Sequence, residues 1–434
     1  MVQDDQGNIY AGTGESFATE DFTNFGPLGY NGGFIGTGIY MSTDGNTFNQ
    51  LEDTKPVMNS DTAAWAFIND LAYNSTNGHL FASTNRGLRV SVNGGTTWTI
   101  AKTTEGESLT GNSFDVNVGS DGKIIADIDN LCYISASGNP VQFVLSSRGD
   151  SASLPTSDIG RIEFAIAPSD PNVVYASVTN EEGALVNIYL SDDGGNDWRI
   201  IAPGGTESLN FFGHGDNVDV GQGIYNNCLE VFPDDPYKVI LGGINLWEGR
   251  KYTETGFYQW TQRSSTFAIP GFISGLHEDQ HSIVFRPGHN NQFAITNDGG
   301  VFTGIVNNPV WDFTNASKTY YSTQYYTCGP SGKKFKIIGG TQDNGVLMID
   351  GYGPGATAKN ASVLPLYDYD GGYSFISSID EFAYIVSGFD GTETTIRRTD
   401  DGALSYSNSF LSGDISIPED AFMLPSLLWE NFDN

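Results

Sequence analysis

Three side chains in one short segment have the types and spacing of metal ligands. His277, Asp279 and His281 lie in the segment 277–281, which formally matches the H-E-x-x-H pattern of zinc proteases. That chemistry requires both histidines on one face of a helix. Pro270 and Gly275 precede the segment and an apolar run follows it, so we expect no helix and no metalloprotease here.

As a strand, the same segment would place His277, Asp279 and His281 on one face, because side chains alternate along a strand. Two interpretations stay open. The three side chains could bind a divalent cation, which is the one cofactor that the sequence suggests, or they could form hydrogen bonds to neighbouring strands. Structural hydrogen bonding is the favoured interpretation.

Acidic residues could also supply glycosidase chemistry, which needs two carboxyl groups about 5 to 9.5 Å apart. Asp298 and Asp343 lie in Asp-Gly-Gly-Val and Asp-Asn-Gly-Val sequences. Because such sequences recur along the chain, turn capping is favoured over catalysis. A sialidase would need an arginine cluster and an Arg-Ile-Pro motif, but Arg161-Ile162 continues with Glu163.

A Ser-x-Asp-x-Gly-x-x-Trp motif recurs in several parts of the chain. Its carboxylate or amide oxygen can accept N–H groups of a turn, its glycine permits positive φ, and its tryptophan buries a large ring. We therefore expect each copy to fasten a hairpin to its own sheet. The motif residues are, copy by copy, Ser191, Asp193, Gly195 and Trp198; Ser91, Asn93, Gly95 and Trp98; Ser42 and Asp44; and Asp401.

The elements that position these motifs repeat along the chain. Four apolar segments end at Pro168, Pro233, Pro287 and Pro330, and a second apolar segment follows each at the same offset. A sheet of three or four short strands cannot bury both of its faces alone, so neighbouring sheets must stack. Eight units are predicted, near residues 9–48, 68–98, 114–144, 161–201, 225–264, 279–317, 322–351 and 371–406.

Radial stacking of such units predicts an all-β fold, a β-propeller of about eight four-stranded blades. We expect one propeller over residues 1–434 that is open at both ends and is part of a larger propeller or closes on itself. A β-solenoid is the structural competitor, but its repeats are usually shorter.

The charge and hydrophobicity of the sequence exclude some classes of binding partner. Lys and Arg number 20 against 52 Asp and Glu, so 20 − 52 gives a net charge of −32. Such a surface repels phosphate backbones and anionic lipid, so we expect no nucleic-acid partner. No apolar run approaches the length of a transmembrane helix, so we expect no membrane insertion. Three widely spaced cysteines suggest core packing rather than a disulfide framework.

Several segments carry a family resemblance, namely 242–247, 279–281, 297–301 and 339–345, together with the Ser-x-Asp-x-Gly-x-x-Trp copies. The chain resembles the Asp-box (BNR-repeat) propellers related to the luminal domain of sortilin, to sialidases and to the xyloglucanases of glycoside hydrolase family 74. It is most similar to large secreted propeller proteins of bacteria that use type IX secretion. The resemblance implies an extracellular or cell-surface location.

The sequence therefore favours a secreted or cell-surface propeller that binds a glycan or another protein, or acts as a scaffold for them. The alternative is an extracellular glycoside hydrolase that uses a pair of carboxylates in a cleft across the blades. A third hypothesis makes the chain one part of a longer cell-surface assembly.

Overall fold

The computed structural model describes most of the chain. The described residues are 1–14, 16, 35–57, 63–213, 217–252, 256–266, 268, 270–271, 273–307, 309–317, 323–332, 335–342, 344–351, 357–360, 370–389, 394–402, 404–407 and 426–430. The chain divides into two compact units, Met1–Lys318 and Thr319–Asn434, and each is described by itself. A search of these residues for helices finds none with the length and apolar character needed to cross a bilayer.

The described part of the first unit contains six four-stranded antiparallel sheets, which we number as blades 1 to 6 in chain order. Blade 1 contains β1 (Val2–Gln3), β2 (Ile9–Gly12), β3 (Ile39–Ser42) and β4 (Asn49–Gln50). Blade 2 contains β5 (Ile68–Asn74), β6 (His79–Thr84), β7 (Gly87–Ser91) and β8 (Thr99–Ile100). Blade 3 contains β9 (Val116–Val118), β10 (Ile124–Ile128), β11 (Leu131–Ser135) and β12 (Val144–Leu145).

The remaining blades of this unit follow the same order. Blade 4 contains β13 (Arg161–Ile166), β14 (Val174–Thr179), β15 (Leu185–Ser191) and β16 (Arg199–Pro203). Blade 5 contains β17 (Cys228–Val231), β18 (Lys238–Gly242), β19 (Leu246–Lys251) and β20 (Tyr258–Gln262). Blade 6 contains β23 (Gln280–Phe285), β24 (Gln292–Asn297), β25 (Gly300–Ile305) and β26 (Asp312–Asn315).

Short elements connect these blades. A parallel pair, β21 (Ser264–Ser265) and β22 (Ser274–Gly275), joins blades 5 and 6, and two short 3-10 helices are η2 (Glu52–Thr54) and η3 (Glu207–Leu209). The second unit contains blade 7, with β27 (Gly329–Pro330), β28 (Lys336–Gly340), β29 (Val346–Asp350) and β30 (Thr357–Asn360), and blade 8, with β31 (Asp370–Ile376), β32 (Tyr384–Phe389) and β33 (Thr394–Thr399).

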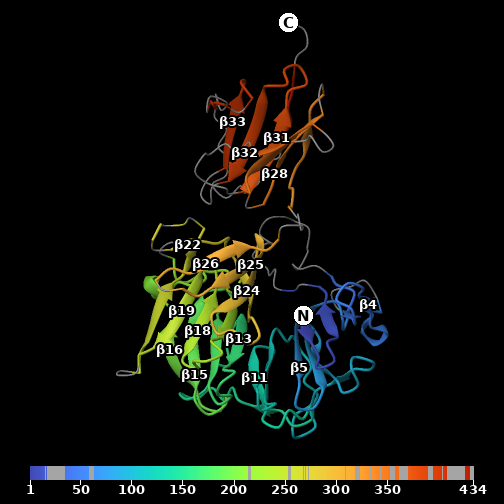
Figure 1. Cartoon of the computed structure of the whole chain (residues 1–434), viewed down its shortest axis with the longest axis vertical. Helices are drawn as coiled ribbons and strands as arrows, with labels where there is room; N and C mark the ends of the chain where they lie inside the picture. Colours follow the sequence, from blue (N-terminus) through green and yellow to red (C-terminus); the bar gives the residue numbers. More distant parts are fainter. Residues whose placement is uncertain are drawn as a thin grey trace. The chain divides into compact units, whose positions relative to one another are not determined.

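The hydrophobic core lies between blades rather than within them. One buried cluster joins each pair of neighbours in the first unit, and another joins blades 7 and 8. The first strands of successive blades also contact one another, from β1 through β5, β9, β13 and β17 to β23. Figure 1 shows the sheets of the first unit in chain order, from blue through green to orange. The predicted all-β propeller fold is confirmed.

The repeated offset in the sequence marks the centre of each blade. The residues eight positions after the four prolines are on second strands, and each is 0% exposed; they are Ala176, Leu241, Ile295 and Ile338. The first strand of blade 1, β1, was not predicted, because it has only two residues. It pairs with β2 through Val2 and Tyr10.

Candidate functional site

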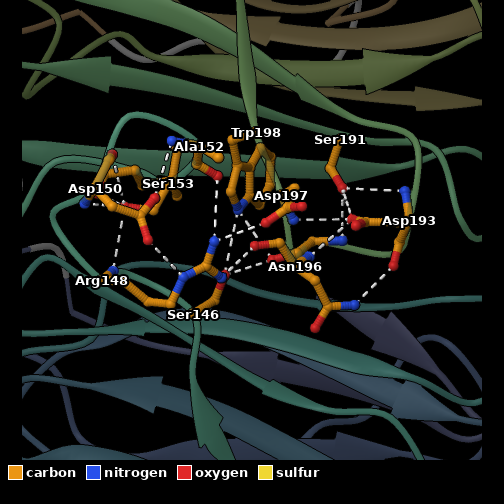
Figure 2. Close-up of polar contacts among 12 residues, drawn as sticks. Ser146, Arg148, Asp150, Ala152, Ser153, Ser191, Asp193, Asn196, Asp197 and Trp198 are labelled. Atoms are coloured by element: carbon orange, nitrogen blue, oxygen red, sulfur yellow. Dashed lines mark hydrogen bonds and ion pairs between the residues drawn. The ribbon is translucent and has the colours of Figure 1, made fainter.

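The Ser-x-Asp-x-Gly-x-x-Trp motif, which we call the Asp-box after its acidic residue, forms the turn between β15 and β16 in blade 4 (Figure 2). Ser191 Oγ donates to Asp193 Oδ1 at 2.7 Å. The same carboxylate oxygen accepts the backbone N–H groups of Asn196 and Asp197, each at 3.0 Å. Gly195 has a φ of 92°, in the left-handed region that glycine enters without steric cost. One carboxylate thus satisfies three donors of a tight turn.

Trp198 anchors this hairpin in a core shared by blades 3 and 4. Its side chain is 4% exposed, and its ring lies 6.4 Å from that of Phe164 between centroids. The indole Nε1 donates to the carbonyl of Gly195 at 2.9 Å and to Ser146 Oγ at 3.2 Å. The tryptophan therefore links its own turn to a residue that follows blade 3.

The segment after blade 3 also holds the hairpin from outside (Figure 2). Arg148 Nη1 donates to the carbonyl of Asn196 at 2.6 Å, and Nη2 donates to Asp197 Oδ1 at 2.7 Å. The backbone N–H of Trp198 donates to the carbonyl of Ala152 at 2.8 Å. The Asp-box thus joins a blade to its predecessor, whereas the sequence analysis predicted only attachment to its own sheet.

The copy in blade 2 repeats this arrangement with an amide in place of the carboxylate. Ser91 Oγ donates to Asn93 Oδ1 at 3.0 Å, and the N–H of Gly95 donates to Ser91 Oγ at 2.9 Å. Trp98 Nε1 donates to the carbonyl of Gly95 at 3.1 Å. The backbone N–H of Trp98 donates to Asp53 Oδ2, in η2 of the preceding blade, at 2.7 Å.

The weaker copy in blade 1 retains the turn but lacks the tryptophan. Asp44 Oδ1 accepts the N–H groups of Thr47 at 2.7 Å and Asn46 at 2.8 Å, and the hydroxyl of Ser42 at 3.0 Å. These donors favour the ionised carboxylate and lower the pKa of Asp44 to about 2.

Hydrogen bonds also lower the carboxyl pKa values of Asp401 and Asp193. Hydroxyl donation by Ser405 and Thr399 holds the pKa of Asp401 well below its usual range. At Asp193 partial burial acts in the opposite direction, but hydrogen bonds from the backbone and from Ser191 lower the pKa of the carboxyl. The residues of this motif are therefore occupied by turn formation.

The structure separates the three predicted metal ligands. Strand β23 begins at Gln280, so His277 and Asp279 precede it, and Asp279 has a φ of 63° that interrupts strand alternation. Asp279 Oδ1 accepts the side-chain amide of Asn226 at 2.7 Å. A shared strand face for His277, Asp279 and His281 is therefore wrong. Within the described ranges, no group of three His, Cys, Asp or Glu side chains is placed to hold a metal ion.

His281 instead pairs with an acid that the sequence analysis considered separately. His281 Nε2 lies 2.6 Å from Asp298 Oδ1, and Tyr225 OH donates to the same oxygen at 2.9 Å. The rings of Tyr225 and His281 meet edge to face at 4.7 Å. Asp298 thus links the segment before β17 to blade 6, which agrees with a structural role. Asp343 lies outside the described residues.

A set of carboxyl groups that the sequence analysis missed lies on the first strands of the blades. Asp70, Glu163 and Glu230 are the third residues of β5, β13 and β17. Burial, and for Glu163 a nearby like charge, raises the pKa of Glu163 to about 7; burial alone raises that of Glu230 to about 8. Arg161 Nη2 donates to Glu163 Oε2 at 2.7 Å. A raised pKa is the property that a general acid needs.

A pocket of about 310 Å³ lies on the outer half of blade 5. In the register of β19 and β20, Glu248 faces Thr261 and Arg250 faces Gln259, so these four share one face. The described residues that line it are Glu248, Arg250, Lys251, Tyr252, Gln259, Thr261 and Arg263.

Two of the lining residues, Glu248 and Arg263, form an ion triad with Lys238. Glu248 Oε2 accepts Arg263 Nη2 at 2.8 Å, and Glu248 Oε1 lies 3.5 Å from Lys238 Nζ. The Arg263 guanidinium also lies 5.5 Å from the ring centre of Trp311, and its Nη1 donates to the carbonyl of Pro309 at 3.0 Å. One carboxylate therefore balances two cations, and the triad keeps a net positive charge.

A local signal in the sequence could have revealed this pocket. Residues 238–263 contain four basic residues and two acidic ones, so this segment has a net charge of 4 − 2 = +2. The net charge of the whole chain is −32. Alternation along the hairpin then places Lys238, Glu248 and Arg250 on one face.

Comparisons with known proteins show likeness in structure only. No protein-family model and no curated protein matches the sequence. A GH74 xyloglucanase from Xanthomonas campestris is 12% identical, with a TM-score of 0.39, over 86% of this chain and 61% of that one. An ancestral GH74 enzyme is 14% identical, with a TM-score of 0.40, over 84% of this chain and 65% of that one.

A third similar structure is the Cps50 (Swd1) β-propeller domain of Myceliophteria thermophila, which is 8% identical, with a TM-score of 0.38, over 74% of this chain and 93% of that one. The present chain spans less than two thirds of the length of the two GH74 enzymes. At these identities and scores, the likenesses bear on no residue and no activity.

Proposed function

We propose that the protein is a secreted or cell-surface propeller that binds a glycan or another protein and serves as a rigid binding or scaffolding module. The observation that supports this proposal is the pocket on blade 5. Its lining combines cations with the hydroxyl and amide groups of Tyr252, Thr261 and Gln259. The carboxylate among its described lining residues, Glu248, is 5% exposed and is held by Arg263 and Lys238. Such a lining suits retention of a ligand better than acid–base chemistry.

Blade stacking supports a scaffolding role. Because each core cluster lies between two blades, one blade cannot move without disturbing the core that it shares with its neighbours. The surface loops are therefore attached to a rigid framework. A rigid frame lowers the entropic cost of holding a binding surface in shape. The extracellular location rests on the resemblance to secreted Asp-box propellers.

A glycoside hydrolase is the second candidate, and the carboxyl groups on the first strands favour it. The pKa values of Glu163 and Glu230 are raised to about 7 and about 8, within the range of a general acid at neutral pH. Both groups are partly exposed rather than fully buried. The Asp-box acids do not qualify, because turn N–H groups occupy them.

A polysaccharide screen separates the two candidates. Affinity electrophoresis with neutral, carboxylated and sulfated polysaccharides measures retention, and a parallel assay with chromogenic glycosides measures turnover. The proposal predicts retention without turnover. Sustained turnover that Glu163→Gln or Glu230→Gln abolishes would establish the hydrolase, whereas absence of any retained glycan or protein partner would remove the binding proposal.

A further inference from the structure

We propose that the pocket on blade 5 binds the carboxylate of an acidic glycan, a chain that contains uronic acid or another sugar acid. This inference rests on the proposed binding function and names the class of ligand that the pocket takes.

The pocket includes an exposed cation, Arg250, that could bind an anion. Arg250 is exposed, and no carboxylate among the described residues pairs with it. Its strand partner on β18 is Lys238, and the two cations repel each other enough to help lower the pKa of Lys238, for which burial is the larger cause. An incoming carboxylate would relieve this repulsion and could accept both N–H groups of the guanidinium fork.

The groups beside Arg250 suit a sugar ring. Tyr252 is 55% exposed, and its hydroxyl donates to Gln259 Oε1 at 2.6 Å, which limits rotation of the ring. An exposed aromatic face beside amide and hydroxyl groups can hold a pyranose through apolar and hydrogen-bond contacts. Thr261 and Gln259 lie on the same strand face as Arg250 and add hydrogen-bonding groups.

These features favour a glycan over an acidic peptide. Among the described lining residues none is aliphatic and Tyr252 is the one aromatic residue, so they form no apolar pocket for a peptide side chain. The net charge of −32 repels polyanions over most of the surface, so binding of an acidic chain depends on this local positive region. Affinity should therefore fall as salt rises, because the Debye length shortens.

The test uses the complete chain and a pair of ligands that differ only in charge. Isothermal titration with a galacturonic acid oligomer is compared with titration of the same oligomer after methyl esterification. The variants are Arg250→Gln and Tyr252→Ala. The matched control is Arg286→Gln, which removes an exposed arginine of blade 6 that does not line the pocket and whose Nη1 donates to Gln292 Oε1 at 2.9 Å.

The expected results are about tenfold weaker binding of the esterified oligomer, a loss of about tenfold or more in Arg250→Gln, and unchanged affinity in Arg286→Gln. Tyr252→Ala should weaken both oligomers alike, because the ring contacts the sugar rather than its charge. Equal affinity for the two oligomers, or undiminished binding by Arg250→Gln, overturns the inference.

Two further outcomes are informative. Tighter binding of a polyglutamate peptide than of the oligomer overturns the inference in favour of a protein ligand. If the wild-type protein retains a neutral polysaccharide but no acidic one, the inference fails while the proposed binding function stands. Absence of any ligand in the polysaccharide and protein screen defeats both.

Discussion

Asp193 shows how one carboxylate can hold a turn. It accepts two backbone N–H groups and one hydroxyl. We expect Asp193→Ala to lower the free energy of unfolding by about 1 to 2 kcal/mol, because the N–H groups lose their acceptor. Asp193→Asn should cost less than about 0.5 kcal/mol, since Asn93 performs the same task in blade 2. Urea unfolding of both variants measures the difference, and equal losses would contradict this role.

Asp44 predicts an acid-sensitive contribution to stability. Its folded pKa of about 2 lies below the ordinary value of 3.8, so the ionised form is favoured in the folded state. This contribution is present above pH 4 and is lost as the pH falls from about 4 to about 2. Thermal unfolding of wild type and Asp44→Asn should therefore differ at pH 5 and converge near pH 2. A difference that persists unchanged at pH 2 would refute this assignment.

Glu230 predicts the opposite dependence. Burial raises its folded pKa to about 8, above the ordinary value of 4.5. Its contribution is fully present below pH 4.5 and is lost as the pH rises through about 8. Glu230→Gln should remove part of the decline in stability of the wild type between pH 5 and pH 9. Glu207→Gln, at an exposed position in η3, is the control and should leave the profile unchanged.

Residue chemistry was only partly predictable from the sequence. The Asp-box turns followed from local rules, because the acceptor, the glycine and the tryptophan act within eight residues of one another. The predicted alignment of His277 with His281 on one strand face was wrong. The positive φ of Asp279 and its hydrogen bond to Asn226 depend on a neighbouring blade, which local rules do not describe. The carboxyl groups on the first strands were missed because each lies in a different repeat.

At the scale of elements, the latch between blades 3 and 4 is the feature most open to experiment. Arg148 joins the segment after blade 3 to the Asp-box hairpin through Asn196 and Asp197. Because these ion pairs are partly exposed, Arg148→Ala should lower global stability by less than about 1 kcal/mol.

The larger effect of Arg148→Ala should be local. Hydrogen exchange should quicken in residues 146–153 and 195–198, since these backbone groups lose a shared clamp. The equivalent hairpin of blade 2, residues 91–98, forms no hydrogen bond with an arginine among the described residues and is the internal reference. Equal acceleration in both hairpins would show that the arginine acts on the whole fold rather than on this latch.

The elements themselves were largely predictable, and for a physical reason. Proline ends a strand and an apolar run at a constant offset begins the next, so Pro168 with Ala176 and Pro287 with Ile295 locate the hairpins of their blades. Very short strands were not predicted. The two-residue β1 has too few side chains for a recognisable alternation, and its pairing with β2 depends on tertiary contacts.

At the scale of the whole molecule, function depends on surfaces that the stacked blades display. Repeats predicted the stacking, because a four-stranded sheet must share its apolar faces with its neighbours. They did not predict the basic pocket of blade 5, which combines side chains from two strands of one blade, β19 and β20, with Tyr252 and Arg263. The extent of ring closure over residues 1–434 stays a prediction.

The central claim is that this propeller retains its ligand without changing it. The most direct measurement is mass spectrometry of a polysaccharide oligomer that the native protein retains, recovered after prolonged incubation at neutral pH. Our account predicts that the oligomer is recovered at its original mass. Shortened oligomers formed by the wild type, but not by Glu163→Gln or Glu230→Gln, would contradict it and identify a hydrolase.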